Sequence, residues 1–369
     1  MQILIHMKSF KTILIIFLIF IFDIIFTKSY QLYKLSAFAN NRYMVTNDFY
    51  HHEMKKNHIG KGYSGEPIFT NEYGLIQLEN QSEINLENKK NIILIGDSHT
   101  QGAGVAYKDT FAGILTNKLK DEKNLINLSA VSYSPSIYFY KTKYFIENHN
   151  MKFSDLYVFI DISDPYDELY RYEVKNEKVI DRKNVSSPFI DTFYDKIIYK
   201  LKNFVIKNTT ILYKSLLSIK NFLNKKSTEE KLFFEDYGFI INHQANLWTF
   251  DEKYFEEEGY KGIELCKKYL ELLKEMVEKN NANLTIAVHP WPGQIYRDDK
   301  NNKQSSIWQK WAKDNNVNFI DFSELYFKQK NRTKSEKLDF IDKNFLKKDM
   351  HINESMHQTV ANELMKYIN

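Results

Sequence analysis

The sequence contains a single cysteine, Cys266, among 369 residues. One cysteine excludes a disulfide within the chain and any metal site built from several cysteines. Cys266 lies in the stretch 262–278, where apolar residues recur at the spacing of one helical face. We therefore interpret Cys266 as a small buried hydrophobic residue and not as a nucleophile.

A large excess of charge of one sign is also lacking. The chain has 51 Lys and Arg against 47 Asp and Glu, a formal net charge of +4. The two signs are mixed along the chain, without a basic stripe interleaved with aromatic residues, so no nucleic-acid partner is expected. Hydrophobic residues make up 43% of the sequence, which is ample material for a core in one large domain or two ordinary ones.

An apolar run at residues 13–26 lies between Lys11 and Lys28 and contains Asp23 near its far end. The stretch of about 16 residues between the lysines is slightly below the roughly 20 that span a bilayer. No small-residue cleavage pattern follows, so we interpret residues 1–30 as an uncleaved signal anchor forming a transmembrane helix, with Asp23 at the interface.

The lysines before this run favour a cytoplasmic N-terminus. The rest of the chain would then lie outside the membrane, in the periplasm or its equivalent, as part of a single-pass protein. Residues 31–89 are polar and show no strong periodicity. They are predicted to be a membrane-proximal lead-in, packed loosely on the main domain.

From residue 90 to residue 369, short apolar runs alternate with amphipathic stretches. Strands are expected at 91–96, 124–128, 156–162, 283–288 and 317–322, and helices at 107–120, 135–148, 262–279, 305–314 and 354–367. This alternation predicts an α/β three-layer sandwich around a central parallel sheet. The stretch 165–260 interrupts it and is too long for an ordinary connection, so it is either a lid-like insertion or a decorated loop without function.

The string Gly96-Asp97-Ser98-His99 directly follows the apolar run 91–95. A serine after a buried parallel strand lies at the carboxyl edge of the sheet, where open α/β sheets bind ligands. Turns use Gly, Asp and Ser freely, so the string alone is weak. Its place at a strand end makes Ser98 a candidate nucleophile.

The second candidate string, Asp349-Met350-His351, precedes the last predicted helix. A serine hydroxyl becomes a good nucleophile when a base accepts its proton, and histidine is the usual base. A carboxylate fixes the histidine tautomer and stabilises the imidazolium. Asp349 could instead cap the helix at Glu354, and His351 could be a surface residue. Together with Ser98, however, they predict a catalytic triad of Ser98, His351 and Asp349.

These strings resemble the SGNH/GDSL hydrolases. Gly96-Asp97-Ser98 is similar to the first block of that family, and Asp349-Met350-His351 resembles its last block in the form found in membrane-associated members. Residues 125–134 resemble the second block, and residues 157–164 resemble the third. The resemblance spans residue 91 to the C-terminus without the insertion, and it implies the flavodoxin-like sheet of that family.

Two positions depart from the family pattern. Ser132 stands where the second block has a glycine whose backbone N–H binds the oxyanion, and that N–H survives any side chain. Ser163 stands where the third block has an asparagine, whose side chain is a longer donor. The resemblance implies an oxyanion hole from Ser98, Ser132 and Ser163, and loss of one donor costs on the order of a hundredfold in rate. Some polysaccharide acyltransferases share such departures, which favours acyl transfer.

Two further residues, His289 and Trp291, follow the strand predicted at 283–288. They are predicted to line a substrate groove, where an aromatic face suits a sugar ring, although a structural turn explains the neighbouring prolines equally well. His357 is interpreted as a packing residue. The clusters His51-His52-Glu53 and Asp161 with Asp164 lack recognisable ligand spacing, so neither a metal nor a cofactor is expected.

The function predicted from these features is ester hydrolysis or O-acetyl transfer on a cell-envelope glycan, through an acyl-enzyme on Ser98. Residues alone do not choose between esterase and acetyltransferase. Transfer across the membrane would require a partner protein as acyl donor, because one spanning segment is expected. The altered second and third blocks motivate an alternative, a catalytically weak or inactive glycan-binding or assembly protein that keeps the fold.

Overall fold

The computed structural model describes residues 17–29, 43–62, 64–81, 83–182, 236–299, 303–327 and 332–368, with the single positions 208, 209, 211, 212, 215 and 233. Residues 43–183 and 234–369 form one compact unit, and residues 1–42 and 184–233 form another. Each unit is described by itself, and the larger one contains all the candidate site residues.

The larger unit is built on a five-stranded sheet. Its strands are β5 (Ile92–Ile95), β6 (Leu125–Asn127), β7 (Asp155–Phe159), β10 (Asn283–Val288) and β11 (Asn318–Asp321), in the spatial order β11-β10-β7-β5-β6. Every neighbouring pair is parallel. The predicted parallel sheet is therefore confirmed. Because the chain leaves β6 and returns on the other side of β5, the order reverses between β5 and β7, which is where such sheets bind ligands.

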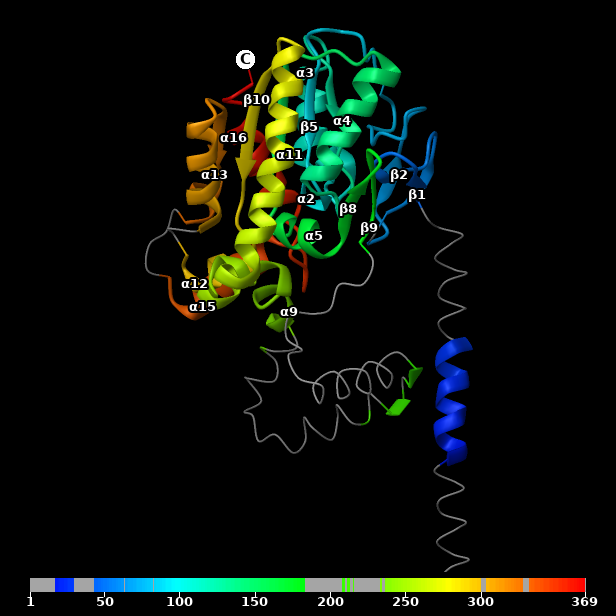
Figure 1. The fold of residues 1–369 in the computed structure, drawn as a ribbon. Helices are drawn as coiled ribbons and strands as arrows, with labels where there is room; N and C mark the ends of the chain where they lie inside the picture. Colours follow the sequence, from blue (N-terminus) through cyan, green and yellow to red (C-terminus); the bar gives the residue numbers. More distant parts are fainter. Residues whose placement is uncertain are drawn as a thin grey trace, which may run out of the picture. The chain divides into compact units, whose positions relative to one another are not determined.

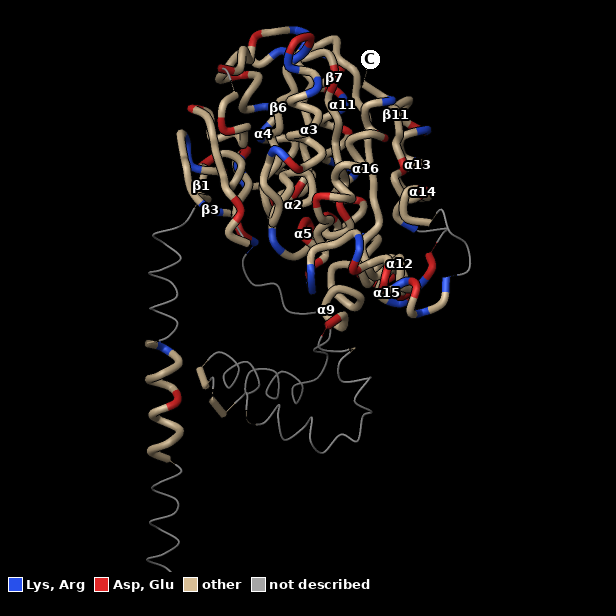
Figure 2. Tube along the Cα trace, turned by 180° about the vertical axis from the view of Figure 1, so that it is seen from behind, with Lys and Arg blue, Asp and Glu red and all other residues tan. Residues whose placement is uncertain are grey.

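Helices cover both faces of this sheet (Figures 1 and 2). On one face lie α4 (Pro135–His149), α11 (Tyr260–Lys279) and α13 (Lys303–Asp314), and on the other lie α3 (Phe111–Leu119) and α16 (Glu354–Leu364). The strands are apolar on both sides, as Ile92 to Ile95 are all at most 1% exposed. This is the predicted three-layer α/β sandwich.

The long helix α11 illustrates how the sequence pattern sets the packing. Its apolar residues at the helical spacing are buried, namely Ile263, Cys266, Leu270, Leu273 and Val277. They pack into the same core cluster as Ile93 and Ile95 of β5. Cys266 is therefore a core residue, as predicted.

Shorter elements complete the unit. They are α2 (Ser98–Gln101), η1 (Tyr107–Asp109), α5 (Asp164–Tyr170), α9 (Gly238–Ile241), η2 (Gln244–Thr249), α10 (Glu252–Tyr254), η3 (Phe255–Gly259), α12 (Pro292–Arg297), α14 (Ser323–Tyr326) and α15 (Lys334–Asn344). Along the chain trace in Figure 2, Lys and Arg are interspersed with Asp and Glu.

The segment after the predicted anchor differs from expectation. Residues 43–89 contain two antiparallel hairpins, β1 (Met44–Asn47) with β2 (His51–Met54) and β3 (Ile59–Lys61) with β4 (Pro67–Phe69). Tyr50 is 1% exposed and packs in the main core cluster. The prediction of a loosely packed lead-in is wrong for these residues, because isolated apolar side chains without periodicity still anchor a segment.

Much of the predicted insertion 165–260 also belongs to the main unit. Its first part forms α5 and the hairpin β8 (Tyr172–Lys175) with β9 (Lys178–Asp181). In its last part, Trp248 is 1% exposed and its indole N–H donates to the carbonyl of Ile162 at 2.8 Å. The part left outside the main unit is 184–233, most of which lies outside the described residues.

The predicted signal anchor is only partly described. Residues 17–29 are helical, and residues 1–16 and 30 lie outside the described residues. Where the structure describes the chain, no helix is both long and apolar enough to cross a membrane. Asp23 is 2% exposed, and its carboxylate accepts hydrogen bonds from the backbone N–H groups of Ile211 and Leu212 at 2.9 and 2.7 Å.

Candidate active site

The candidate nucleophile follows a tight turn at the end of β5. A Cβ atom on Gly96 would lie 2.2 Å from Oγ1 of Thr100 and 3.0 Å from the carbonyl oxygen of Phe159, so only glycine fits. Asp97 then caps the short helix α2 by accepting the N–H of His99 at 2.9 Å. Ser98 is the first residue of α2, so its own N–H has no partner within that helix.

The three predicted triad residues lie together. Ser98 Oγ is 2.8 Å from His351 Nε2, and His351 Nδ1 is 2.6 Å from Asp349 Oδ1. The side chains of His351 and Asp349 are 15% and 20% exposed, so the group can still be reached from solvent. With Nδ1–H donating to Asp349, Nε2 can accept the Ser98 proton, which is the arrangement that general-base activation requires.

The loop that carries Asp349 and His351 is fixed on both sides. The N–H of Leu346 donates to the carbonyl of His351 at 2.8 Å, and Asp349 Oδ1 also accepts the N–H of His351 at 3.1 Å. Asn353, not Asp349, caps α16 by accepting the N–H of Met356. Asp349 is therefore available to the histidine.

The pKa of Asp349 is lowered below its ordinary value. Burial by itself would raise it, but the hydrogen bond and charge of His351, with backbone N–H groups of His351 and Met350, outweigh that effect. Asp349 is thus an ionised acceptor at neutral pH, as the orienting residue of a triad must be.

Ser132 lies in a turn with a φ of +60°, the left-handed conformation that favours glycine. This explains why a glycine is usual at the corresponding position of the family that the sequence resembles. Three side chains hold this turn. His52 Nε2 lies 2.8 Å from the carbonyl of Val131, and Gln101 accepts the N–H of Val131. The hydroxyl of Tyr172 donates to the carbonyl of Ser132 at 2.6 Å.

His52 and Tyr172 are positioning residues that sequence reasoning missed. They come from segments interpreted as a lead-in and an insertion, so no motif connected them with residues 131–132. Burial lowers the pKa of His52 to about 4, so its ring is neutral near pH 7 and Nε2–H can donate to the Val131 carbonyl.

Ser163 is engaged differently from the prediction. Its hydroxyl and its backbone N–H both donate to Asp161 Oδ1, each at 2.8 Å. Because the single hydroxyl proton is used within the protein, Ser163 is not poised as an oxyanion donor. The oxyanion role of the Ser98 and Ser132 backbone N–H groups stays a prediction.

The prediction that His289 and Trp291 line a substrate groove requires correction. Trp291 is 2% exposed and His289 is 7% exposed, so neither ring is presented to solvent. The indole N–H of Trp291 donates to Asp161 Oδ2 at 2.9 Å. Both residues follow β10 at the expected edge, but they pack inward because Asp161 lies there.

Three carboxyl groups are buried beneath the triad, on Asp97, Asp161 and Asp164, none more than 4% exposed. Burial raises the pKa of Asp97 well above its ordinary value, and the nearby Asp161 raises it further. Burial, then the charges of Asp161 and Asp97, likewise raise the pKa of Asp164, whose carboxyl accepts the hydroxyl of Tyr138 at 3.0 Å. The site is therefore rich in acidic groups.

His99, the residue after the nucleophile, is buried rather than exposed. It is 3% exposed, and its ring centroid lies 4.6 Å from that of His351. Burial, followed by the nearby His289, lowers its pKa well below the ordinary value, so its ring is neutral. His357 is also buried, and its Nδ1 accepts the N–H of Phe111 at 3.2 Å, which agrees with a packing role.

Comparison with solved structures finds esterases. An acetyl xylan esterase, AlAXEase, is 14% identical with a TM-score of 0.40, and the match covers 76% of this chain and 100% of that chain. A catalytic mutant of the acetylxylan esterase Axe2 from Geobacillus stearothermophilus is 9% identical with a TM-score of 0.41, covering 78% and 97%. The esterase EstA from Pseudoalteromonas sp. is 9% identical with a TM-score of 0.36, covering 75% and 95%.

Similarity at this level carries no argument about function. No protein-family model matches the sequence. No curated protein matches it either. The sheet order and the Ser98–His351–Asp349 geometry agree with the resemblance to SGNH/GDSL hydrolases, and they are the observations on which a function can be built.

Proposed function

We propose that the protein is a serine esterase or acyltransferase of the SGNH type, with Ser98 as nucleophile, His351 as general base and Asp349 as the residue that orients it. One observation carries this proposal. Two hydrogen bonds, of 2.8 and 2.6 Å, connect a serine at a strand end with a histidine 253 positions later and with its carboxylate. Such a chain of contacts at the switch point of the sheet matches what activation of a serine requires.

In the first half-reaction, Ser98 Oγ attacks the ester carbonyl while His351 Nε2 takes the hydroxyl proton. Asp349 stabilises the imidazolium that forms. The tetrahedral intermediate collapses when the C–O bond to the alcohol breaks, and His351 returns its proton to the leaving oxygen. The products are a free alcohol and an acyl group bound to Ser98.

In the second half-reaction, His351 removes a proton from the acceptor as the acceptor attacks the acyl-enzyme. The bond between the acyl carbon and Ser98 Oγ then breaks, and His351 returns the proton to Ser98 Oγ, which restores the free enzyme. Water as acceptor gives a carboxylic acid, and a sugar hydroxyl gives a new ester. In both cases the negative oxygen of the intermediate is held by the N–H groups of Ser98 and Ser132, and Ser132 adopts the left-handed φ of +60° that a glycine would.

The substrate class we propose is an acetyl ester on a cell-envelope glycan. The apolar run at residues 13–26 with its preceding lysines supports an extracytoplasmic, membrane-anchored location, where such glycans are found. Accessibility of the anchored domain to protease added outside spheroplasts tests this location. If the enzyme is a transferase, a membrane partner would present the acyl donor.

Labelling with a fluorophosphonate probe tests the chemistry, since the probe reacts with activated serines. We expect full-length protein to be labelled at Ser98, and the variant Ser98→Ala to remain unlabelled. Unlabelled wild-type protein that still binds acetylated glycan would support the alternative, a binding or assembly protein that keeps the fold.

Mass analysis of envelope glycan separates the two enzymatic outcomes. Cells carrying Ser98→Ala should show more acetyl groups if the protein is an esterase, and fewer if it is an O-acetyltransferase. Unchanged acetylation, with a labelled wild-type enzyme, would reject acetylated envelope glycan as the substrate while leaving the serine chemistry intact.

A further inference from the structure

Three residues that the proposed triad does not use meet at the carboxyl edge of the sheet. His99 lies in α2 after β5, Asp161 follows β7, and His289 follows β10. The three strands are neighbours in the order β10-β7-β5, so the topology brings these side chains to one point. All three are buried, at 3%, 1% and 7% exposed.

The ligand-type atoms of this cluster have the separation that a shared ion requires. His99 Nε2 and His289 Nε2 lie 3.9 and 3.8 Å from Asp161 Oδ2, and one atom from each residue lies within 4.8 Å of the others. Ligands bound to one tetrahedral Zn²⁺ at about 2.0–2.1 Å are roughly 3.3 Å apart. Around such an ion each His–Asp pair would close by about 0.5 Å, and the two imidazole nitrogens, which lie within 4.8 Å of each other, by at most about 1.5 Å.

Within the described residues, the imidazoles lack the partners that buried polar groups need. Both ring nitrogens of His99 and Nδ1 of His289 make no hydrogen bond. The distances of 3.8 and 3.9 Å to Asp161 are too long for hydrogen bonds. Leaving buried nitrogens without partners is costly, so the two unpartnered nitrogens of His99, one of them the Nε2 that lies 3.9 Å from Asp161, indicate a missing ligand.

The charge of the surroundings favours a cation. The Asp161 carboxylate is 1% exposed and accepts hydrogen bonds from Trp291 and Ser163, and in the described part of the chain it forms no ion pair with Lys or Arg. Buried charges in proteins are normally paired or bound to metal. A divalent ion would pair with this carboxylate.

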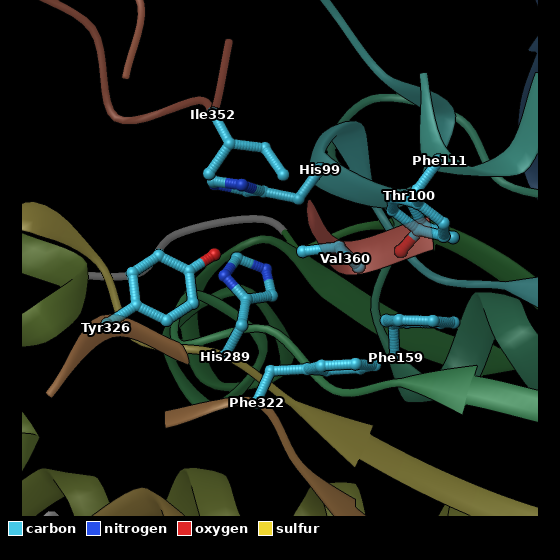
Figure 3. Close-up of a pocket in the computed structure, with 9 residues that line it drawn as sticks. All are labelled: His99, Thr100, Phe111, Phe159, His289, Phe322, Tyr326, Ile352 and Val360. Carbon is cyan, nitrogen blue, oxygen red and sulfur yellow. The ribbon is translucent and has the colours of Figure 1, made fainter. Parts of the chain in front are cut away.

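The neighbours would also support a metal site. Trp291 and Ser163 hold the Asp161 carboxylate in place through both oxygens. Next to the histidines is a cavity of about 10 Å³, which is about the room of one water molecule. Figure 3 shows the Tyr326 hydroxyl pointing toward the His289 ring across this space. That hydroxyl is also buried without a partner, so a water could connect it with His289 Nδ1 and fix the tautomer.

We propose that His99, Asp161 and His289 form a Zn²⁺ site with water as the fourth ligand. Two imidazoles and one carboxylate are a donor set that Zn²⁺ accepts, while Mg²⁺ and Ca²⁺ prefer oxygen. No sequence motif predicts this site, because its ligands are separated by 62 and 128 positions. The His99 ring lies 4.6 Å from that of His351, so the ion would sit next to the base.

Titration of metal-free, full-length protein with Co²⁺ tests the site directly. We expect one equivalent to bind, with the intense visible bands of four-coordinate Co²⁺, and Zn²⁺ to displace it. The variants His99→Asn and His289→Asn remove the Nε2 ligands while keeping a polar group near the Nδ1 position. Each should weaken Co²⁺ binding about 100-fold or more, because losing a residue that only supports a metal ligand already costs about 10- to 100-fold.

The matched control is His357→Asn, which removes another buried histidine but leaves the cluster intact. It should bind Co²⁺ as the wild type does. Thermal unfolding without metal establishes that each variant folds, and Zn²⁺ should raise the Tm of the wild type and the control only. Binding below about 0.1 equivalent, or equal binding by His289→Asn, overturns the proposal. The readout is metal binding, so it is independent of whether the protein is an esterase.

Discussion

The substitution Asp349→Asn tests the triad most sharply, because of how this aspartate holds the histidine. One oxygen, Oδ1, accepts both the Nδ1–H of His351 at 2.6 Å and its backbone N–H at 3.1 Å. An asparagine can keep both bonds with its carbonyl oxygen. The tautomer of His351 would then be preserved, and the variant would lose the negative charge alone.

The size of the effect follows from that charge. The side chains are 15% and 20% exposed, so an effective dielectric constant near 20 applies. A carboxylate about 4 Å from the imidazolium charge then contributes roughly 4 kcal/mol to the transition state. We expect kcat to fall about 1,000-fold, at 1.36 kcal/mol for each factor of ten, with KM within about threefold.

Initial rates on an activated aryl acetate measure this effect. The control is Asp342→Asn, which changes an exposed aspartate that accepts the hydroxyl of Tyr237, and its kcat should be unchanged. A fall of about 10,000-fold would indicate that the asparagine flips and inverts the tautomer, as in serine proteases. A kcat for Asp349→Asn within threefold of wild type would refute the assigned role.

Three further predictions concern the supporting structure. Ser132→Gly relieves the strain of the φ of +60° and keeps the backbone N–H. Its activity should stay within a few-fold of wild type, and urea unfolding should show up to about 1 kcal/mol more stability. Ser132→Val should lower both the activity and the stability. Tyr172→Phe removes the hydrogen bond to the Ser132 carbonyl. It should lower kcat several-fold at constant KM and cost about 1 kcal/mol in stability. A kcat equal to that of wild type would mean that the turn needs no such support. Burial lowers the pKa of His357 to about 3, against about 6.5 in the unfolded chain. Below pH 6.5 the unfolded chain therefore takes up the proton first. The contribution of this residue to stability then declines with falling pH, at a slope that approaches about 1.4 kcal/mol per pH unit. From pH 6.5 to 5.5 the stability difference between wild type and His357→Asn should narrow by about 1 kcal/mol in urea unfolding, because the unfolded chain is already half protonated at pH 6.5. A constant difference would contradict the assignment.

The sequence by itself predicted the parallel sheet and the meeting of Ser98, His351 and Asp349, which the structure brings within hydrogen-bond distance. The apolar run before Gly96 is buried on both faces, so its pattern predicts a central strand, and Ser98 must then lie at the carboxyl edge. The spacing of Asp349 and His351 allows both side chains to reach one pocket. These inferences are local, because each depends on periodicity or on a short string beside a recognisable element.

The tertiary structure alone decided which other residues serve the site. Trp291 and His289 are predicted to line a substrate groove but are buried, because Asp161, which accepts the indole N–H, follows a different strand, β7. Similarly, His52 supports the carbonyl of Val131 across 79 positions, and no periodicity connects such residues. Contacts of this kind arise from the order of strands in the sheet, which the sequence pattern of each strand does not contain.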